Sequence, residues 1–466
     1  MTTTVLPRRH ASTPPEPRRG AWAPAPTDVT ARPSLPTASD HGRRPPRSAR
    51  TGRIAAGRQA RLTLHPVTLV VRSVAVVLGL LPSALPHSAW IQAGVVLTVL
   101  LLAQPVVALG RRRWPAAAAG RLLLRAVGMG LAVALPLEVV AAERLRTATG
   151  MATSGPAYWL AVAVLVTGAV LLARGIVTGV RRSGRFVARG WRGTLLAVLV
   201  VVLGWAALSA FAPSPRPGAP DPQERPLAVA SPVGAVRVYA AARPGETLTA
   251  RATRAADALV AAGGLHRRHV VVMFPTGSGW VDPTAVEGFE DRFGADVAEV
   301  SMQSTTTPSW VAYLFQRGSA DAGARALFTA VADRIDALPP AQRPQLHLYG
   351  ESLGAATGRS VFADHRTAAR AADSVCSVLW VGPPGGHGLP ARATSRVRQA
   401  VVANPTDPVV HTHLDSVVVP SGDSTRPWLP VVSFVQQGAD FVASRSVPVG
   451  TGHRYGPHQA DALPTC

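Results

Sequence analysis

The sequence predicts an α-helical membrane domain of about five transmembrane helices, followed by an α/β domain with a mostly parallel sheet. Two observations predict this division. Apolar stretches recur between residues 66 and 212, each near the ~20 residues needed to cross a bilayer. After residue 230, short apolar runs rich in β-branched residues alternate with helical patterns, as in a parallel sheet covered on both faces.

The positive charge of the chain is concentrated in its first part. Residues 1–212 contain 26 Arg and 5 acidic residues, whereas residues 213–466 contain 22 Arg and 21 acidic residues. The chain has no Lys, and its Arg residues flank apolar stretches instead of gathering with aromatic residues. Membrane topology therefore explains the basic charge better than nucleic-acid binding does, and we expect no nucleic-acid partner.

Four segments are predicted along the chain. Residues 1–65 are rich in Pro, Arg, Ser and Thr and have no apolar period, so we expect a disordered cytoplasmic tail. Residues 66–212 form the transmembrane domain, residues 213–230 a Pro-rich linker, and residues 231–466 the α/β domain. Because prolines stiffen an extended linker, we expect a tethered α/β domain that folds and works by itself.

The predicted spans also set the orientation of the chain. Arg-rich loops, including Arg111–Arg113, alternate with loops poor in Arg, and such basic loops favour the cytoplasmic side. Five spans and a cytoplasmic N-terminus place the α/β domain outside the cytoplasm, so we expect a multi-pass protein of the cell membrane. The five stretches are Val67–Leu85, Trp90–Leu109, Leu122–Ala142, Tyr158–Val177 and Thr194–Ala212.

One acid, Glu138, lies inside the third apolar stretch. An intramembrane acid is a candidate for an ion path, which gives thin support to a transport function. Glu138 also lies close to Glu143 and the outer boundary. The simpler interpretation is an interfacial acid that reaches water.

Six strands and three helices are expected in the α/β domain. The expected strands are Ala235–Ala240, His269–Phe274, Asp296–Val300, Leu346–Tyr349, Ser377–Val381 and Val397–Ala403. The expected helices are Arg254–Ala262, Ala320–Ala337 and Ala355–His365.

The sharpest motif is a G-x-S-x-G pattern at residues 350–354, with Ser352 at its centre. An apolar strand precedes it and an Ala-rich helix follows, which is the strand–turn–helix context of a nucleophile elbow. Such a turn presents the serine hydroxyl above the sheet, at the N-terminus of a helix. The alternative is a Gly-Ser turn without chemistry. The motif predicts the α/β-hydrolase fold with Ser352 as the nucleophile.

A serine nucleophile needs a base and an acid, which follow it in this fold in the order Ser, acid, His. Asp407 lies in a loop where a proline breaks an apolar strand, and His453 follows a short apolar run and two glycines. The expected catalytic residues are therefore Ser352, Asp407 and His453. The weaker candidates are Asp415, Asp423, His411, His413, His458 and His387, of which the last precedes the acid.

An oxyanion hole needs two N–H donors. One is expected from the amide of Leu353, and the other from Gly277 or Ser278 in a loop after an early strand. A phosphate-binding loop is excluded because no Lys follows, whereas a plain turn stays an alternative. Trp280 and Trp310 are candidates for an acyl groove, although they are equally well explained as core residues.

Neither a metal nor a cofactor is expected. Cys376 and Cys466 form no metal-ligand spacing and no CxxC motif. A buried free thiol is the simpler interpretation of Cys376. A disulfide between the two cysteines is also open if the domain lies outside the cytoplasm.

Together these motifs resemble the actinobacterial multi-pass membrane α/β-hydrolases, a largely uncharacterised family with an N-terminal membrane domain and a C-terminal hydrolase domain. The resemblance covers residues 67–466 and implies a membrane-bound enzyme with a Ser352, Asp407, His453 triad, but no substrate. The motifs are PTGSGWVDP (Pro275–Pro283), PSW (Pro308–Trp310), YGESLG (Tyr349–Gly354), WVGPP (Trp380–Pro384), NPTDPVV (Asn404–Val410) and GTGHRYG (Gly450–Gly456).

The sequence thus predicts a membrane-anchored serine hydrolase that acts on carboxylic esters through an acyl-enzyme. A lipid or cell-envelope ester is expected because the site is tethered close to the outer leaflet. The elbow does not distinguish hydrolysis from acyl transfer, because both share the acyl-enzyme. A further alternative is a membrane scaffold or receptor with an inactive hydrolase fold.

Overall fold

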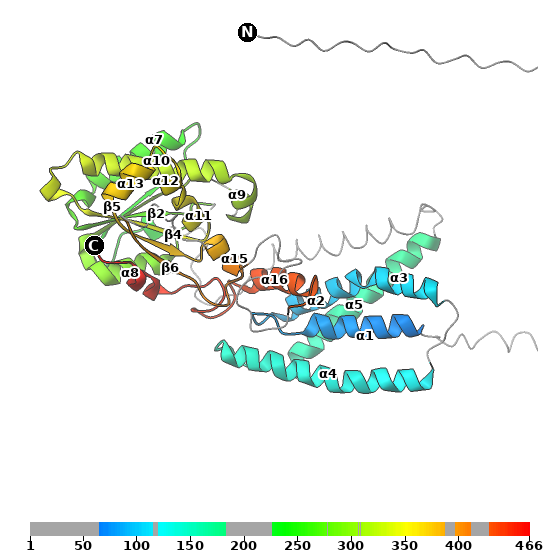
Figure 1. The fold of residues 1–466 in the computed structure, drawn as a ribbon. Coiled ribbons are helices and arrows are strands. Elements are labelled where there is room, and N and C mark those ends of the chain that lie inside the picture. The colour runs from blue at the N-terminus through cyan, green and yellow to red at the C-terminus, as the bar shows by residue number, and fades with distance from the viewer. Residues whose placement is uncertain are drawn as a thin grey trace, which may run out of the picture. The chain divides into compact units, whose positions relative to one another are not determined.

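The computed structural model describes residues 65–114, 120–182, 226–276, 278–305, 307, 309–386, 397–411 and 428–466 (Figure 1). The described residues all belong to one compact unit, Thr63–Cys466. The predictions for the N-terminal tail, the fifth span and most of the linker lie outside the described residues.

The helical region contains three segments that are long and apolar enough to cross a membrane, Ala89–Arg113, Arg121–Ala148 and Gly155–Gly175. They confirm the second, third and fourth expected spans as apolar helices. The helices of this region are α1 (Pro66–Leu80), α2 (Ala89–Leu102), α3 (Gln104–Arg113), α4 (Arg121–Ala148) and α5 (Gly155–Arg182).

The first expected span is shorter than predicted. Helix α1 has 15 residues and is therefore about 22 Å long, which is less than the ~30 Å hydrocarbon core of a bilayer. Leu81 has an extended backbone and precedes Pro82, and a residue before proline disfavours the helical conformation. The apolar residues up to Leu85 therefore continue as a loop.

The structure does not agree with the expectation that the side chain of Glu138 reaches water. This side chain lies in α4 and is buried, and its Oε2 atom has no hydrogen-bond partner among the described residues. The burial of Glu138 depends on the tertiary fold, so its position in the sequence near the outer boundary could not predict it.

The α/β domain is built on a six-stranded sheet in which all pairings are parallel, in the order β1-β3-β2-β4-β5-β6. All six expected strands are confirmed. They are β1 (Val236–Ala240), β2 (His269–Phe274), β3 (Val297–Met302), β4 (Gln345–Glu351), β5 (Val375–Val381) and β6 (Arg398–Val402).

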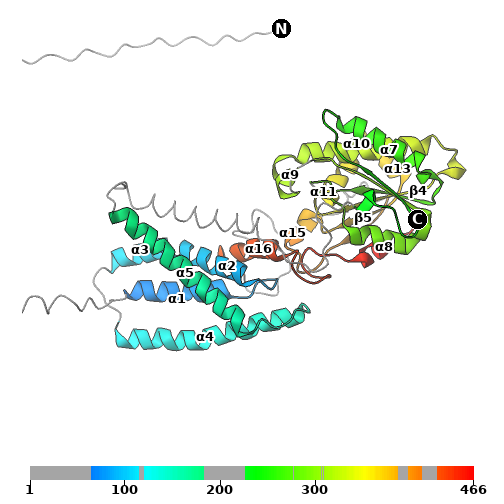
Figure 2. The same ribbon diagram turned by 180° about the vertical axis from the view of Figure 1, so that it is seen from behind.

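Helices cover both faces of this sheet, with α7 and α10 on one face and α8 on the other (Figures 1 and 2). Strand β2 shows why its sequence is continuously apolar. Val270 and Val272 enter the core on one face, whereas Val271 and Met273 enter the core on the other, because successive side chains alternate across a sheet. The first helices of this domain are α7 (Leu248–Ala261), α8 (Pro283–Phe293), α9 (Ser309–Phe315) and α10 (Arg317–Asp336).

The remaining helices follow β4 and β6 in the chain. Two of the three expected helices are confirmed as α7 and α10, whereas the expected helix Ala355–His365 is broken into α11 and α12. The helices are α11 (Leu353–Gly358), α12 (Ser360–Ala363), α13 (Ala368–Ser374), α15 (Pro408–His411) and α16 (Val432–Ala443).

Helix α16 does not pack on the sheet. Its buried residues Ala439 and Ala443 form an apolar cluster with Ile91, Val95 and Val99 of α2. Both views show α16 beside α2 (Figures 1 and 2). The C-terminal part of the chain and the N-terminal helical region therefore share a core, which the expectation of a tethered, independent domain did not include.

Cys376 and Cys466 form a disulfide, with their Cα atoms 5.6 Å apart. The simpler expectation of a free thiol at Cys376 is therefore wrong. Strand β5 and the C-terminal segment are distant in sequence but meet in the fold, where Arg398 of β6 also donates to the carbonyl oxygen of Thr465 (3.0 Å).

Candidate active site

Ser352 occupies the sharp turn between β4 and α11. Its backbone has φ 55° and ψ −118°, a conformation that is costly for a residue with a Cβ atom and is often found at functional sites. The amide of Ser352 donates to the carbonyl oxygen of Val381 at 2.9 Å. Leu353 begins α11, and the first amides of a helix have no partner within it. The predicted elbow geometry is present.

The two motif glycines are required by close backbone contacts. A Cβ atom on Gly350 would lie 2.5 Å from the backbone of Gly354. A Cβ atom on Gly354 would collide with the carbonyl oxygen of Phe274, at the end of β2. Glycine at both positions lets strand, turn and helix approach closely, as the elbow motif predicts.

His453 and Asp407 are hydrogen-bonded to each other, with 2.7 Å between Nδ1 and Oδ2. Asp407 is fully buried, and its Oδ1 atom accepts the amide of Val409 at 2.9 Å. Its Oδ2 atom also accepts the hydroxyl of Tyr455 at 2.5 Å. A carboxylate held in this way fixes the orientation of the imidazole and stabilises its cation.

Two residues of the Asp407 loop hold the backbone on each side of His453. The side-chain amide of Asn404 donates to the carbonyl oxygens of Gly452 (2.9 Å) and Arg454 (3.1 Å). The hydroxyl oxygen of Thr406 accepts the amide of Gly452 at 2.9 Å. The segment that carries the acid therefore also positions the segment that carries the candidate base.

Gly382 lies next to both the Ser352 turn and the imidazole of His453. It follows Val381, the partner of the Ser352 amide, and has φ +51°. A Cβ atom at Gly382 would lie 2.8 Å from Cε1 of His453, so the imidazole packs against the end of β5 beside the elbow. Among the described residues, Nε2 of His453 is buried without a hydrogen-bond partner. This nitrogen is available to accept a proton, and catalytic hydrogen bonds often tighten only when substrate binds.

The loop after β2 is a closed turn held by Gln303. The amide of Thr276 donates to the carbonyl oxygen of Trp280 at 2.8 Å, and Gln303 donates to the carbonyl oxygen of Ser278 at 3.1 Å. Gly279 has φ +87°, and a Cβ atom there would collide with Tyr239. Gly277, an expected oxyanion donor, lies outside the described residues.

The two tryptophans expected near the substrate have different outcomes. Trp280 is half-buried, and the guanidinium of Arg445 lies 5.1 Å from its ring centroid, within the range of a cation–π contact. Arg445 follows α16 in the sequence. The side chain of Trp310, in α9, lies outside the described residues.

The rival triad candidates are less well placed where they are described. His458 is exposed and pairs with Asp461 at 3.2 Å. His411 ends α15, and its backbone amide contacts the carbonyl oxygen of Asp407 at 3.4 Å. The other rivals, Asp415, Asp423, His413 and His387, lie outside the described residues.

Two groups beside the candidate triad have raised pKa values. Glu351 is buried, and this burial, together with the charge of Asp282, raises its pKa well above the usual range. Burial also raises the pKa of Tyr455, and the neighbouring Asp407 carboxylate raises it further. Tyr455 therefore remains a hydrogen-bond donor to Asp407 at neutral and alkaline pH.

One group of side chains has the composition of a metal site. Ligand atoms of His347, Cys376 and Cys466 lie within 4.8 Å of one another. The disulfide occupies both sulfur atoms, and Nδ1 of His347 contacts the hydroxyl of Ser377 at 2.9 Å. These atoms already have partners, and burial lowers the pKa of His347 to about 3.

Sequence reasoning missed three residues that hold the site together, Asn404, Tyr455 and Gln303. Asn404 lies three residues before Asp407, and Tyr455 lies two residues after His453. Their polar side chains could therefore have marked them as candidates for positioning the site. Gln303 follows β3 without a recognisable motif, and only the fold brings it to the loop after β2.

A comparison with protein families agrees with the parallel sheet and the elbow. Residues 236–419 match the model of the Alpha/beta-hydrolase family. The matched segment contains Ser352 and Asp407 and ends before His453. The C-terminal region therefore has the α/β-hydrolase fold, as the G-x-S-x-G motif predicted.

Other comparisons are less informative. No curated protein matches the chain. Among solved structures, Trichoderma reesei cutinase in complex with a C11Y4 phosphonate inhibitor is 17% identical, with a TM-score of 0.23, over 43% of this chain and 91% of the cutinase chain. A structure named m3DLH is 20% identical, with a TM-score of 0.22, over 31% of this chain and 61% of the other. At these TM-scores neither likeness bears on function.

Proposed function

We propose that the chain is a membrane-anchored serine hydrolase that acts on carboxylic esters, with Ser352 as nucleophile, His453 as base and Asp407 as the orienting acid. The observation that carries this proposal is the 2.7 Å hydrogen bond between His453 and Asp407, beside an elbow that strains the Ser352 backbone. The alternative of an inactive hydrolase fold finds no support in these residues, because all three candidate members are present.

In the proposed reaction, Nε2 of His453 takes the proton of the Ser352 hydroxyl while the oxygen attacks the ester carbonyl carbon. The amide of Leu353 and an amide of the loop after β2 stabilise the oxyanion. Collapse of the tetrahedral intermediate releases the alcohol, which takes its proton from His453. Water then attacks the acyl-enzyme and gives a proton to His453, which passes it to the Ser352 oxygen as the carboxylic acid leaves.

The proposed substrates are esters of lipids or of the cell envelope. Three helices of the chain are long and apolar enough to cross a membrane. The Cys376–Cys466 disulfide supports an extracytoplasmic location, because disulfides persist mainly in oxidising compartments. An extracytoplasmic site beside the membrane meets amphiphilic esters in preference to cytoplasmic metabolites.

Labelling with a fluorophosphonate tests the chemistry directly. The intact chain in membranes should be labelled covalently, and Ser352→Ala should abolish labelling and lower p-nitrophenyl ester hydrolysis by about 10³-fold or more. Ser360→Ala is the matched control, because Ser360 lies on the following α12 and its hydroxyl bonds the carbonyl oxygen of Asp321. That control should remain labelled. Undiminished labelling of the Ser352→Ala variant would reject Ser352, and no labelling of the intact chain would favour the inactive scaffold.

A further inference from the structure

Helix α16 combines an apolar composition with a single charged residue. Residues 428–443 contain one ionisable side chain, Asp440. One side of the helix packs against α2 through Ala439 and Ala443, in a cluster that reaches Val99. Since Val99 lies within the candidate span Ala89–Arg113, α16 runs beside part of a helix that is expected to be inside the bilayer.

Asp440 is only 2% exposed, and residues of the loop between α1 and α2 form hydrogen bonds with its carboxylate. It accepts hydrogen bonds from the hydroxyl of Ser83 (2.5 Å) and the backbone amides of Ala84 (3.0 Å) and Leu85 (3.1 Å). Nε2 of His87 lies 2.9 Å from the same carboxylate. The one charge of α16 is therefore satisfied inside the protein, as a helix within lipid requires.

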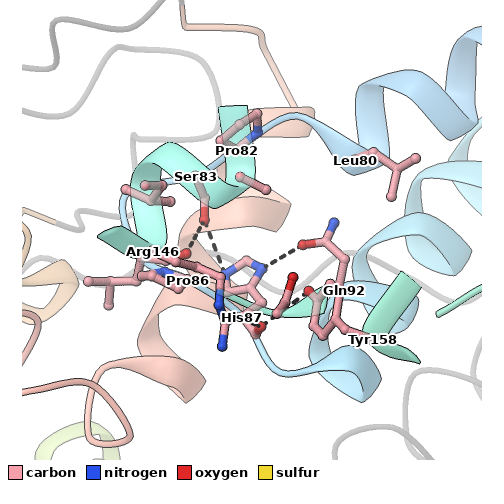
Figure 3. Close-up of a pocket in the computed structure, with 12 residues that line it drawn as sticks. Leu80, Pro82, Ser83, Pro86, His87, Gln92, Arg146 and Tyr158 are labelled. Carbon is pink, nitrogen blue, oxygen red and sulfur yellow. Dashed lines mark hydrogen bonds between the residues drawn. The ribbon is translucent and has the colours of Figure 1, made fainter. Parts of the chain in front are cut away.

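The loop that binds Asp440 is itself fixed by the membrane helices. Ser83, His87 and Gln92 line a small pocket in the helical region, and Figure 3 shows the hydrogen bonds that link them. Arg146 of α4 and Tyr158 of α5 both donate to the carbonyl oxygen of His87, at 3.3 Å and 3.2 Å. The partner of α16 is thus a rigid part of the helical region.

The opposite side of α16 carries large apolar side chains that are partly exposed. Phe434 is 37% exposed and Phe441 is 47% exposed, and residues seven apart lie on the same face of a helix. The candidate span α5 presents a comparable outward surface, since Leu165 is 43% exposed. Because α16 packs on α2, which belongs to the candidate span Ala89–Arg113, we assign lipid acyl chains as the occupant of this face.

We propose that α16 is a re-entrant membrane helix, docked on α2 through its inner face and on lipid through Phe434 and Phe441. Its 12 residues span only about 18 Å, which is too short to cross the bilayer core, so it enters and leaves on the same side. A helix is suited to this position because it satisfies its own backbone hydrogen bonds.

This placement has a consequence for the candidate base. Ser444 caps the C-terminus of α16, and its carbonyl oxygen accepts the backbone amide of His453 at 3.0 Å. A Cβ atom on Gly452 would lie 2.7 Å from that oxygen and 3.1 Å from Leu85 of the α1–α2 loop. The His453 segment is therefore fastened to an element within the membrane.

Cysteine accessibility tests the lipid-facing helix. The chain contains two cysteines, which form the disulfide, so an introduced cysteine supplies the reactive thiol. Phe434→Cys and Phe441→Cys should each react with a membrane-impermeant maleimide at least about tenfold more slowly than Val229→Cys in phosphatidylcholine liposomes, because charged reagents do not enter the hydrocarbon core. Val229, just before the α/β domain, is 59% exposed. Leu165→Cys supplies the matched lipid-facing control, and SDS should make every thiol reactive.

The same assay distinguishes lipid from other occupants. Rapid labelling at residues 434 and 441 in intact liposomes would overturn the proposal. Protection in native membranes that is lost in liposomes would assign the face to another protein. Protection that is lost at one copy per vesicle would assign it to a second copy of the chain. Labelling reports the position of α16 whether or not the chain hydrolyses esters, so its failure is distinguishable from failure of the proposed function.

Discussion

At the scale of single residues, Tyr455 adds a donor that the predicted triad did not contain. Its hydroxyl shares Oδ2 of Asp407 with His453. Hydrogen bonds to a charged group contribute about 1.5–3 kcal/mol, so this donor reduces the attraction that Asp407 exerts on the protonated imidazole. Tyr455 is therefore expected to adjust the basicity of His453 without touching the substrate, as a positioning residue.

Replacing Tyr455 tests this role. Tyr455→Phe should lower kcat by about tenfold and move the acidic limb of the kcat/KM profile to higher pH, because Asp407 then holds the protonated His453 more strongly. Since burial and Asp407 raise the pKa of Tyr455, the unmodified protein should show no loss of activity from its ionisation up to pH 10. Tyr349→Phe is the control, because the hydroxyl of Tyr349 bonds Gln459 and Glu351 and not Asp407. An unshifted pH profile for Tyr455→Phe would contradict the proposed role.

The residues most open to prediction were those whose roles are set by local sequence. Ser352 was predictable because an elbow needs glycines two residues before and after it. The contact between Asp407 and His453 was predictable from chain order together with strand ends, whereas their catalytic roles stay a prediction. Gln303 was not predictable, because its partner at Ser278 is set by the parallel sheet and not by any local pattern.

At the scale of elements, Asp440 connects the α1–α2 loop to α16 and, through Ser444, to His453. Asp440→Asn should lower kcat for a soluble ester by about tenfold or more with little change in KM, because the buried amide cannot replace all the carboxylate's hydrogen bonds. Ser83→Ala should have a smaller effect in the same direction. Asp461→Asn, at an exposed ion pair with His458, should be neutral.

A purely structural role for Asp440 has a different signature. It would lower the amount of folded protein while leaving kcat per active site, measured by fluorophosphonate titration, unchanged. Finding an unchanged kcat in the Asp440→Asn variant would separate α16 from catalysis.

The elements also show where sequence patterns stop being informative. The six strands were predictable because fully buried parallel strands are continuously apolar and β-branched. Helix α1 was predicted too long because its apolar composition continues into a loop that Pro82 begins. Helix α16 was not expected at all, since its packing partner on α2 lies more than 300 residues earlier in the sequence.

At the scale of the whole molecule, the two parts of the chain should behave as one enzyme. A fragment of residues 226–466 removes the partner of α16 and leaves Ala439, Ala443 and Val447 without their apolar contacts. Exposing such residues is unfavourable by about 25 cal/mol for each Å² of apolar surface. The fragment should therefore hydrolyse a soluble p-nitrophenyl ester at least about tenfold more slowly than the full chain, and a lipid ester more slowly still.

The linker-based expectation makes the opposite forecast. A truly independent domain would keep full turnover on the soluble ester and lose activity only on the membrane lipid. Thermal unfolding followed by circular dichroism would establish whether the fragment folds, and equal kcat values for a folded fragment and the full chain would restore the tether interpretation.

The attachment of the His453 segment to α16 has a mechanical consequence. In the proposed placement, the candidate base His453 is held by a helix that contacts both the protein and acyl chains. Thinning, stretching or stiffening of the bilayer should then shift α16 and change the distance between the candidate nucleophile and the candidate base. We therefore expect turnover to depend on lateral tension in the membrane as well as on the concentration of the substrate.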